Sequence, residues 1–285
     1  MLVLVTGITG HQGSYVARHL LERGHRIRAL VRDPKSPRLA DFSAKGIELA
    51  TGSFDAPETI VKAARGVDAM FLMGTRSTSG PGEAAQGIAA VDAAKAAEVP
   101  WLIYSSVGSA DRATGIPHFE AKFAVEEHLR GAGVRYAVSA PTAFMENFTF
   151  PYQLPGLRQG RLGGGTSPAR GVQMVALDDL GAFVTLLLEN PTLFAGRRTE
   201  VASDLVSQAE AARVLTELSG RKIDYQRIPP EALRAQNPDS AKMLEWFERD
   251  GYKADIEGLR REYPQVGWQR FGEWAAGQDW VRLLA

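Results

Sequence analysis

Short apolar runs alternate with amphipathic stretches through the first half of the chain. The apolar runs occupy residues 2–5, 27–31, 47–50, 69–73, 101–105 and 136–140. Helical patterns lie between them, over residues 11–23, 57–64, 83–97 and 118–130. The run 69–73 is apolar throughout, which is typical of a strand buried on both faces. This alternation predicts an α/β fold with a doubly wound parallel sheet, in which ligands bind at the carboxyl ends of the strands.

The pattern changes after Pro141. Three prolines and the run 163–165 of glycines predict an irregular crossover, in which the glycines form either a plain turn or the hinge of a lid. Strands are expected over 172–176 and 198–202, with a helix between them that Asp178 or Asp179 caps. From residue 207 onward helical patterns dominate. We therefore expect a Rossmann domain over 1–150, to which later strands around 172–202 return, and a smaller, mostly helical substrate or partner lobe over 151–285.

Composition and charge exclude several classes of function. Among 285 residues, 33 Lys and Arg balance 33 Asp and Glu, so no global basic surface is expected to bind nucleic acid. The absence of cysteine excludes disulfides and thiolate ligands, and the five histidines show no metal-binding spacing, so we expect no metal site. No apolar run approaches the length of a membrane span, and the N-terminus lacks the pattern of a signal peptide. We expect a cytoplasmic protein, with its oligomeric state left open.

The sharpest motif is the sequence T-G-I-T-G-H-Q-G at residues 6–13. Gly7 permits a tight turn out of the first strand, Gly10 lets the backbone approach a pyrophosphate, and Gly13 allows close packing of helix and strand. The N-terminus of the following helix favours an anion. We therefore predict a dinucleotide-binding turn, against the alternative of an ordinary strand-to-helix turn. The other residues predicted to contact the cofactor here are Thr6, Thr9, His11 and Gln12.

Two further segments predict which dinucleotide binds. Arg32 stands where an NAD-binding protein usually has an acidic residue, and an arginine there binds a 2′-phosphate, with Lys35 assisting. The prediction is therefore NADP, although Asp33 favours a free ribose and a solvated loop is the plain alternative. After the third strand, Asp55 either accepts a hydrogen bond from the adenine amino group or caps the helix that begins at Pro57.

Several segments together resemble the NmrA-like branch of the atypical short-chain dehydrogenases. They are V-R-D-P (31–34), H-F-E-A-K-F-A-V-E-E-H-L (118–129), P-T-A-F-M-E-N-F (141–148), A-L-D-D-L-G (176–181) and G-Y-K-A-D (251–255), beside the turn at 6–13. The resemblance implies an NADP-binding Rossmann domain with a small C-terminal lobe. Some members of the family reduce quinones or other small electrophiles with NADPH, and others act as redox sensors that bind partner proteins.

The resemblance also implies residues at the nicotinamide end. Short-chain dehydrogenases place a catalytic tyrosine four residues before a lysine; here the lysine is Lys122, but His118 stands in place of the tyrosine. Lys122 is assigned to the nicotinamide ribose, and His118 is the candidate proton donor, against a plain surface histidine. Glu126 lies on the same helical face, where it forms a solvated pair with Lys122 in the alternative interpretation. The remaining cofactor contacts predicted are Gly74, Ser105, Phe144 and Asn147, although Phe144 equally suits the core.

Two functions follow from these residues. The first is an NADP(H)-dependent oxidoreductase that transfers hydride to a quinone or similar small electrophile without the usual tyrosine. Such an acceptor weakens the need for a protein acid, because water protonates the stabilised anion. The second is a non-catalytic NADP(H) sensor that binds a protein partner. An epimerase or dehydratase is disfavoured, because those enzymes also need the tyrosine.

Overall fold

The computed structural model describes residues 1–74, 82–234 and 237–285, which form two compact units. Unit 1 comprises Met1–Ala113, His118–Ala140 and Leu180–Thr199. Unit 2 comprises Thr114–Pro117, Pro141–Asp179 and Glu200–Ala285.

A seven-stranded sheet forms the centre of unit 1, in the order β10-β6-β5-β4-β1-β2-β3. The pairs β1–β2, β1–β4, β2–β3, β4–β5 and β5–β6 are parallel. The strands are β1 (Leu2–Thr6), β2 (Arg26–Val31), β3 (Glu48–Thr51), β4 (Ala69–Met73), β5 (Leu102–Ser105), β6 (Tyr136–Pro141) and β10 (Arg198–Val201). The order reverses at β1, so that β2 and β4 flank it, which creates the switch point where ligands bind in such sheets.

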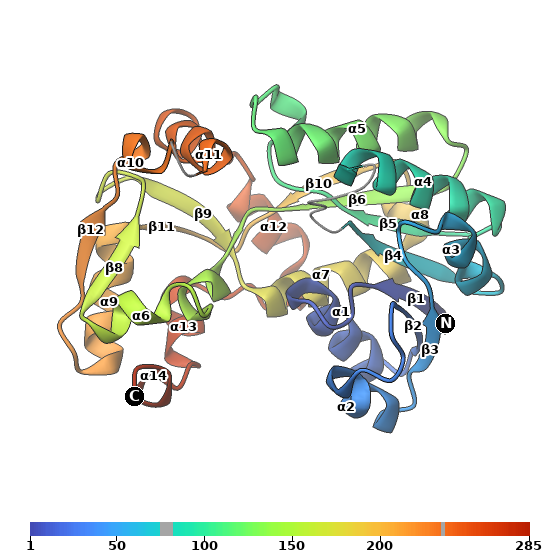
Figure 1. Ribbon diagram of the computed structural model, residues 1–285, viewed down its shortest axis with the longest axis horizontal. Helices are drawn as coiled ribbons and strands as arrows, with labels where there is room; N and C mark the ends of the chain where they lie inside the picture. Colours follow the sequence, from blue (N-terminus) through green and yellow to red (C-terminus); the bar gives the residue numbers. More distant parts are fainter. Residues whose placement is uncertain (75–81, 235–236) are drawn as a thin grey trace. The chain divides into compact units, whose positions relative to one another are not determined.

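Helices cover both faces of this sheet, with α3, α4 and α5 along one face and α1 and α7 along the other (Figure 1). The helices are α1 (His11–Glu22), α2 (Ala40–Ala44), α3 (Pro57–Ala64), α4 (Gly82–Ala96), α5 (Pro117–Gly131), α7 (Leu177–Glu189) and α8 (Pro191–Phe194), with short 3₁₀ turns at Pro37–Leu39 and Ala110–Arg112. Alternate strand residues such as Leu4, Met70 and Leu72 pack against Ile60 and Val91 in one buried cluster. Three alanines of α4, Ala90, Ala93 and Ala94, belong to the same buried cluster.

Unit 2 combines two small sheets with short helices. Its strands are β7 (Ala143–Phe144), β8 (Arg161–Gly164), β9 (Gly171–Val175), β11 (Asp204–Ser207) and β12 (Asp224–Arg227). They pair as β11-β9-β7 and β12-β8. Its helices are α6 (Leu154–Arg158), α9 (Gln208–Ser219), α10 (Pro230–Arg234), α11 (Pro238–Arg249), α12 (Ile256–Glu262), α13 (Phe271–Ala276) and α14 (Trp280–Leu283), with 3₁₀ turns at Met145–Thr149 and Pro264–Val266. Phe271, Trp274 and Trp280 lie in its core.

The doubly wound parallel sheet with a mostly helical C-terminal part is confirmed. Of the two later strands expected to return to the Rossmann domain, β10 joins the central sheet, whereas β9 pairs with β7 and β11 in unit 2. Two further local predictions are wrong. The glycines of 163–165 form neither a plain turn nor a hinge, because Gly163 and Gly164 belong to β8 and pair with β12. A Cβ at Gly164 would lie 2.9 Å from the Tyr225 ring, and one at Gly165 would lie 2.2 Å from Leu244 Cδ1. The glycines therefore serve close packing.

Neither acid proposed as the cap of α7 holds that position. The helix begins at Leu177, which places Asp178 and Asp179 inside its first turn. The buried Asp179 carboxylate accepts hydrogen bonds from Ser203 Oγ at 2.6 Å and from the Gln269 backbone N–H at 2.8 Å. It ties together three segments of unit 2 instead of capping a helix.

Candidate functional site

The turn between β1 and α1 leaves no room for side chains at Gly7 and Gly13. Gly7 has φ +67°, and its carbonyl accepts a hydrogen bond of 2.8 Å from Gly10 N. A Cβ on Gly13 would lie only 2.3 Å from that carbonyl oxygen. Gly10 is the N-cap of α1 and has no side chain that could accept a hydrogen bond from the N–H groups of the first turn. These groups therefore suit an anion, as expected for a glycine-rich turn at a helix N-terminus. Thr6 anchors the turn, since its Oγ1 accepts from Met73 N at 2.8 Å.

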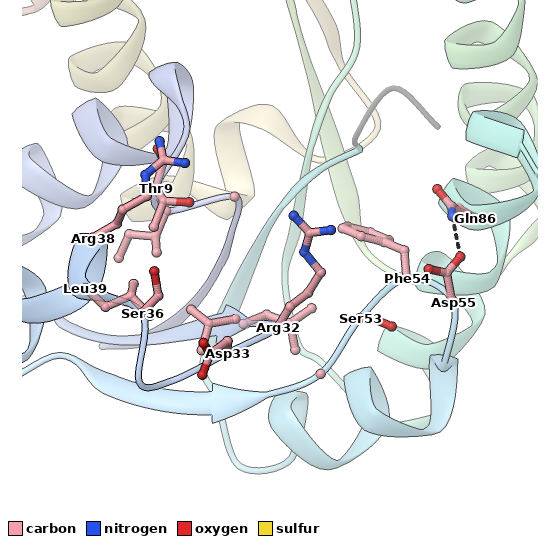
Figure 2. Close-up of a pocket in the computed structure, with 15 residues that line it drawn as sticks. Thr9, Arg32, Asp33, Ser36, Arg38, Leu39, Ser53, Phe54, Asp55 and Gln86 are labelled. Atoms are coloured by element: carbon pink, nitrogen blue, oxygen red, sulfur yellow. Dashed lines mark hydrogen bonds between the residues drawn. The ribbon is translucent and has the colours of Figure 1, made fainter. Parts of the chain in front are cut away.

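A cavity of about 390 Å³ lies between this turn and the ends of β2 and β3. Figure 2 shows the side chains around it. Its lining residues are Gly7, Ile8, Thr9, Leu30, Val31, Arg32, Asp33, Ser36, Arg38, Leu39, Gly52, Ser53, Phe54, Asp55 and Gln86. The cavity thus joins the predicted phosphate turn to the loop predicted to hold the 2′-phosphate.

Two arginines flank the cavity. Arg32 was predicted at this place, whereas Arg38 was not. The Arg38 guanidinium lies 3.4 Å from the Thr9 carbonyl, which brings its charge to the glycine-rich turn. Arg38 follows Arg32 closely in the sequence, and this proximity could have indicated that both arginines lie at one site.

Lys35, which was predicted to assist, is exposed and is not among the lining residues. Asp33 accepts from Lys35 N at 2.9 Å and so stabilises the bend of its own loop.

Asp55 does not cap α3. The N-cap of that helix is Ala56, and no side chain caps it. Instead Gln86 Nε2, on α4, donates a hydrogen bond of 2.7 Å to Asp55 Oδ1 at the cavity wall (Figure 2). The capping interpretation is therefore wrong, and a role for Asp55 toward adenine stays a prediction. Gln86 was missed because it lies within an alanine-rich helix.

Lys122 and Glu126 of α5 pair with residues of other elements and not with each other. Lys122 Nζ lies 2.9 Å from Glu83 Oε1 on α4. Glu126 is buried, and its carboxylate accepts from Ser106 Oγ and from Arg198 Nε, the latter at 2.9 Å. Burial raises the pKa of Glu126, while the Arg198 charge acts in the opposite direction. The suggested solvated pair of Lys122 with Glu126 is thus wrong.

Other predicted contacts lie at the carboxyl ends of the strands. Ser105 Oγ, at the end of β5, donates to Gln12 Oε1 at 2.6 Å and so joins β5 to the glycine-rich turn. Gly74 follows β4, and a Cβ there would lie 3.9 Å from Glu83 Oε1. The half-buried ring of His118, in the first turn of α5, makes an edge contact with Phe119, while His11 is exposed at the start of α1.

Phe144 and Asn147 belong to unit 2, where both are half-buried, and their assignment to the cofactor stays a prediction. Between them in the chain lies Glu146, a buried acid that sequence reasoning did not single out. Both of its carboxylate oxygens accept from Leu177 N at 3.1 Å, and Trp274 Nε1 donates to Oε1 at 3.0 Å. Burial raises the pKa of Glu146 to about 7.

Neither a group of three or more His, Cys, Asp or Glu side chains arranged to hold a metal ion, nor a helix long and apolar enough to cross a membrane, occurs in residues 1–74, 82–234 and 237–285.

The residues of unit 1 fit a phosphorylated dinucleotide. The turn at Gly7 exposes backbone N–H groups with no side chain in the way, and Arg32 and Arg38 bring two positive charges to one cavity. Lys122 pairs with Glu83, whose carboxylate lies beside Gly74 at the carboxyl end of β4. These features place the chain in the class of Rossmann-like α/β proteins with a glycine-rich turn after the first strand.

Within that class the chain belongs to the NmrA-like family, whose model matches residues 1–275. An NmrA-like family domain-containing protein of Dictyostelium discoideum is 26% identical over 267 residues, which cover 87% of this chain and 88% of that protein.

Solved structures share the fold. An NADPH-dependent quinone oxidoreductase of Escherichia coli, crystallised with NADPH, aligns with a TM-score of 0.80 and 23% identity over 97% of this chain and 99% of that one. Nmra, described as a negative transcriptional regulator, aligns with a TM-score of 0.81 and 20% identity over 98% and 99% of the two chains. At these identities the structures establish the common fold.

Proposed function

We propose that this protein binds NADP(H) and reduces a quinone or a similar small electrophile. The observation that carries the proposal is the cavity that joins the Gly7 turn to Arg32 and Arg38. The turn supplies N–H donors for a pyrophosphate, and guanidinium groups bind phosphates through charge-assisted hydrogen bonds. The quinone oxidoreductase of the same fold, crystallised with NADPH, supports this assignment.

In this proposal, residues along the carboxyl edge of the sheet each bind a different part of the cofactor. Arg32 and Arg38 hold the 2′-phosphate, and Asp55 accepts from the adenine amino group. Lys122 binds the nicotinamide ribose near the hydrogen bond that joins Ser105, at the end of β5, to Gln12 in the first turn of α1. NADPH, when bound, supplies the hydride. His118 stands four residues before Lys122 and donates a proton to acceptors that need one.

Binding is tested by comparing NADPH with NADH. Each charge-assisted hydrogen bond contributes about 1.5–3 kcal/mol, so we expect Arg32→Ala and Arg38→Ala each to weaken NADPH about tenfold or more. NADH affinity should stay nearly unchanged. Nicotinamide fluorescence measures both dissociation constants. Arg65→Ala, an exposed arginine that follows α3 outside the cavity, is the matched control. Equal affinity of the natural protein for NADH and NADPH would contradict the assignment of the two arginines.

Turnover is tested with a panel of quinones and enones. We expect acceptor-dependent loss of the NADPH signal, abolished by Lys122→Ala.

A second function rests on a different observation, the histidine in place of the tyrosine, and on the likeness to the regulator Nmra. In that case the chain is a non-catalytic NADP(H) sensor that binds a protein partner. Bound NADPH that persists with every acceptor would favour the sensor.

A further inference from the structure

Lys122 and Glu83 form an ion pair that is almost removed from solvent. The distance from Lys122 Nζ to Glu83 Oε1 is 2.9 Å, and the side chains are only 15% and 10% exposed. Lys122 lies on α5 and Glu83 in the first turn of α4, a helix end where a carboxylate is favoured. Buried ion pairs add little net stability, because desolvation offsets their attraction. A role in stability therefore explains the pair poorly.

The pair stands at the carboxyl ends of β4 and β5. Glu83 Oε1 is 3.9 Å from the position of a Cβ on Gly74, the residue after β4. The negative charge of Glu83 acts on Tyr104 of β5, and together with burial, the larger cause, it raises the pKa of that phenol. The Gln12–Ser105 hydrogen bond joins the same strand end to the glycine-rich turn.

This position and the loop that carries the two arginines lie on opposite sides of β1 along the sheet edge. In the order β5-β4-β1-β2-β3, four strand spacings, about 19 Å, separate β5 from β3. A dinucleotide whose phosphates lie at the β1 turn therefore extends in both directions. With its adenosine half at β2 and β3, its nicotinamide ribose comes to the ends of β4 and β5, where the ion pair lies.

We propose that Glu83 is a positioning and charge-balancing residue, which holds Lys122 at the nicotinamide ribose and cancels its positive charge there. The inference rests on the proposed function. Oxidised nicotinamide carries a positive charge and reduced nicotinamide carries none. An unbalanced ammonium would therefore repel NADP⁺ and leave NADPH largely unaffected. Glu83 removes this bias, so that the site holds both redox forms of the cofactor.

The test compares dissociation constants for NADP⁺, NADPH and adenosine 2′,5′-bisphosphate, which lacks the nicotinamide half, by calorimetry. Glu83→Gln keeps the size and the hydrogen-bond acceptor but removes the charge. We expect it to raise the ratio of the NADP⁺ to the NADPH dissociation constant about tenfold and to leave the bisphosphate unchanged. Glu83→Asp should keep the natural ratio. Glu127→Gln, an exposed glutamate on α5 that pairs with Arg130, is the matched control.

The Glu83→Gln/Lys122→Met double variant keeps the test decisive if an unpaired Lys122 prevents folding. It removes both charges, and we expect a ratio close to the natural one with weaker binding of both nicotinamide cofactors. An unchanged ratio in folded Glu83→Gln protein would overturn the inference, as would a double variant that binds both cofactors as well as the natural protein. Failure of the natural protein to bind even the bisphosphate would overturn the proposed function and this inference with it.

Discussion

Gln86 holds Asp55 at the wall of the cavity through a hydrogen bond of 2.7 Å from its amide nitrogen to Oδ1. Gln86 is only 6% exposed, and among the described residues its Oε1 has no hydrogen-bond partner. A buried amide fixed in this way limits the rotation of the carboxylate. The second oxygen of Asp55 is thereby available to accept from an amino group in the cavity.

The first prediction concerns recognition of adenine. Replacing Gln86 by Leu removes the donor and frees the carboxylate, so we expect NADPH affinity to fall about three- to tenfold, the range of one hydrogen bond. The analogue with hypoxanthine in place of adenine lacks the amino group and should bind the natural protein more weakly than NADPH. The Gln86→Leu variant should discriminate less between the two. Fluorescence titrations with both cofactors measure this, and unaltered discrimination would rule out the role of Gln86.

The second prediction concerns the close approach of α1 to the glycine-rich turn. A methyl group on Gly13 meets the Gly7 carbonyl oxygen at 2.3 Å, so the turn must shift. We expect Gly13→Ala to destabilise the fold by about 2–3 kcal/mol and to abolish NADPH binding. Gly272→Ala is the control, because this helical glycine of α13 has no atom within 4 Å of the new methyl group. That substitution should be neutral or stabilise by up to about 1 kcal/mol. Denaturant titrations measure both effects, and equal stabilities of the two variants would contradict the steric argument.

The third prediction separates acceptors by their need for a proton. Reduction of an enone leaves a basic enolate, whereas reduction of a quinone leaves a stabilised anion that water protonates. General acid catalysis contributes about 10²–10⁴-fold, so we expect His118→Ala to lower kcat for enones at least about a hundredfold. With quinones the change should stay within about threefold. His128→Ala, on the same helix and paired with Asp92, is the matched control. Equal losses with both classes would show that His118 does not act as the acid.

The sequence predicted the elements of unit 1 well for a physical reason. A strand buried on both faces is apolar throughout, and β4 has the ends that its apolar run predicts. The helix α3 also has the predicted ends, and it begins at Pro57. Unit 2 was less predictable, because β8 contains glycines that suggest a turn. The ring of Tyr225, a residue more than 60 positions further along the chain, lies where a side chain at Gly164 would be.

The candidate site was predictable where chemistry and position coincide, as at Gly7 and Arg32. It was not predictable where a side chain interacts with a residue from a distant part of the sequence. Gln86 and Glu83 look like solvent-facing residues of an alanine-rich helix, and only the packing of α4 brings them to Asp55 and Lys122. Local patterns carry no information on such contacts.

The last prediction concerns the dependence of stability on pH. Glu146 has a pKa of about 7 in the folded protein, because burial outweighs the hydrogen bonds from Leu177 N and Trp274 Nε1, and its ordinary value is 4.5. Between these values the folded state holds a proton that the unfolded state has released. Stability therefore decreases as pH rises from about 4.5 to about 7, by up to about 3 kcal/mol in total.

Glu146→Gln tests this directly, because glutamine resembles the protonated acid and does not titrate. We expect the variant to lack this decrease and to gain most in stability over the natural protein above pH 7. Chemical denaturation followed by tryptophan fluorescence at pH 5, 6, 7 and 8 measures the difference. Glu127→Gln, at an exposed position, should leave the pH profile of the natural protein unchanged. Parallel profiles for the Glu146→Gln variant and the natural protein would mean that Glu146 is ionised in the fold throughout this range. The hydrogen bonds from Leu177 and Trp274 would then suffice to hold a buried charge.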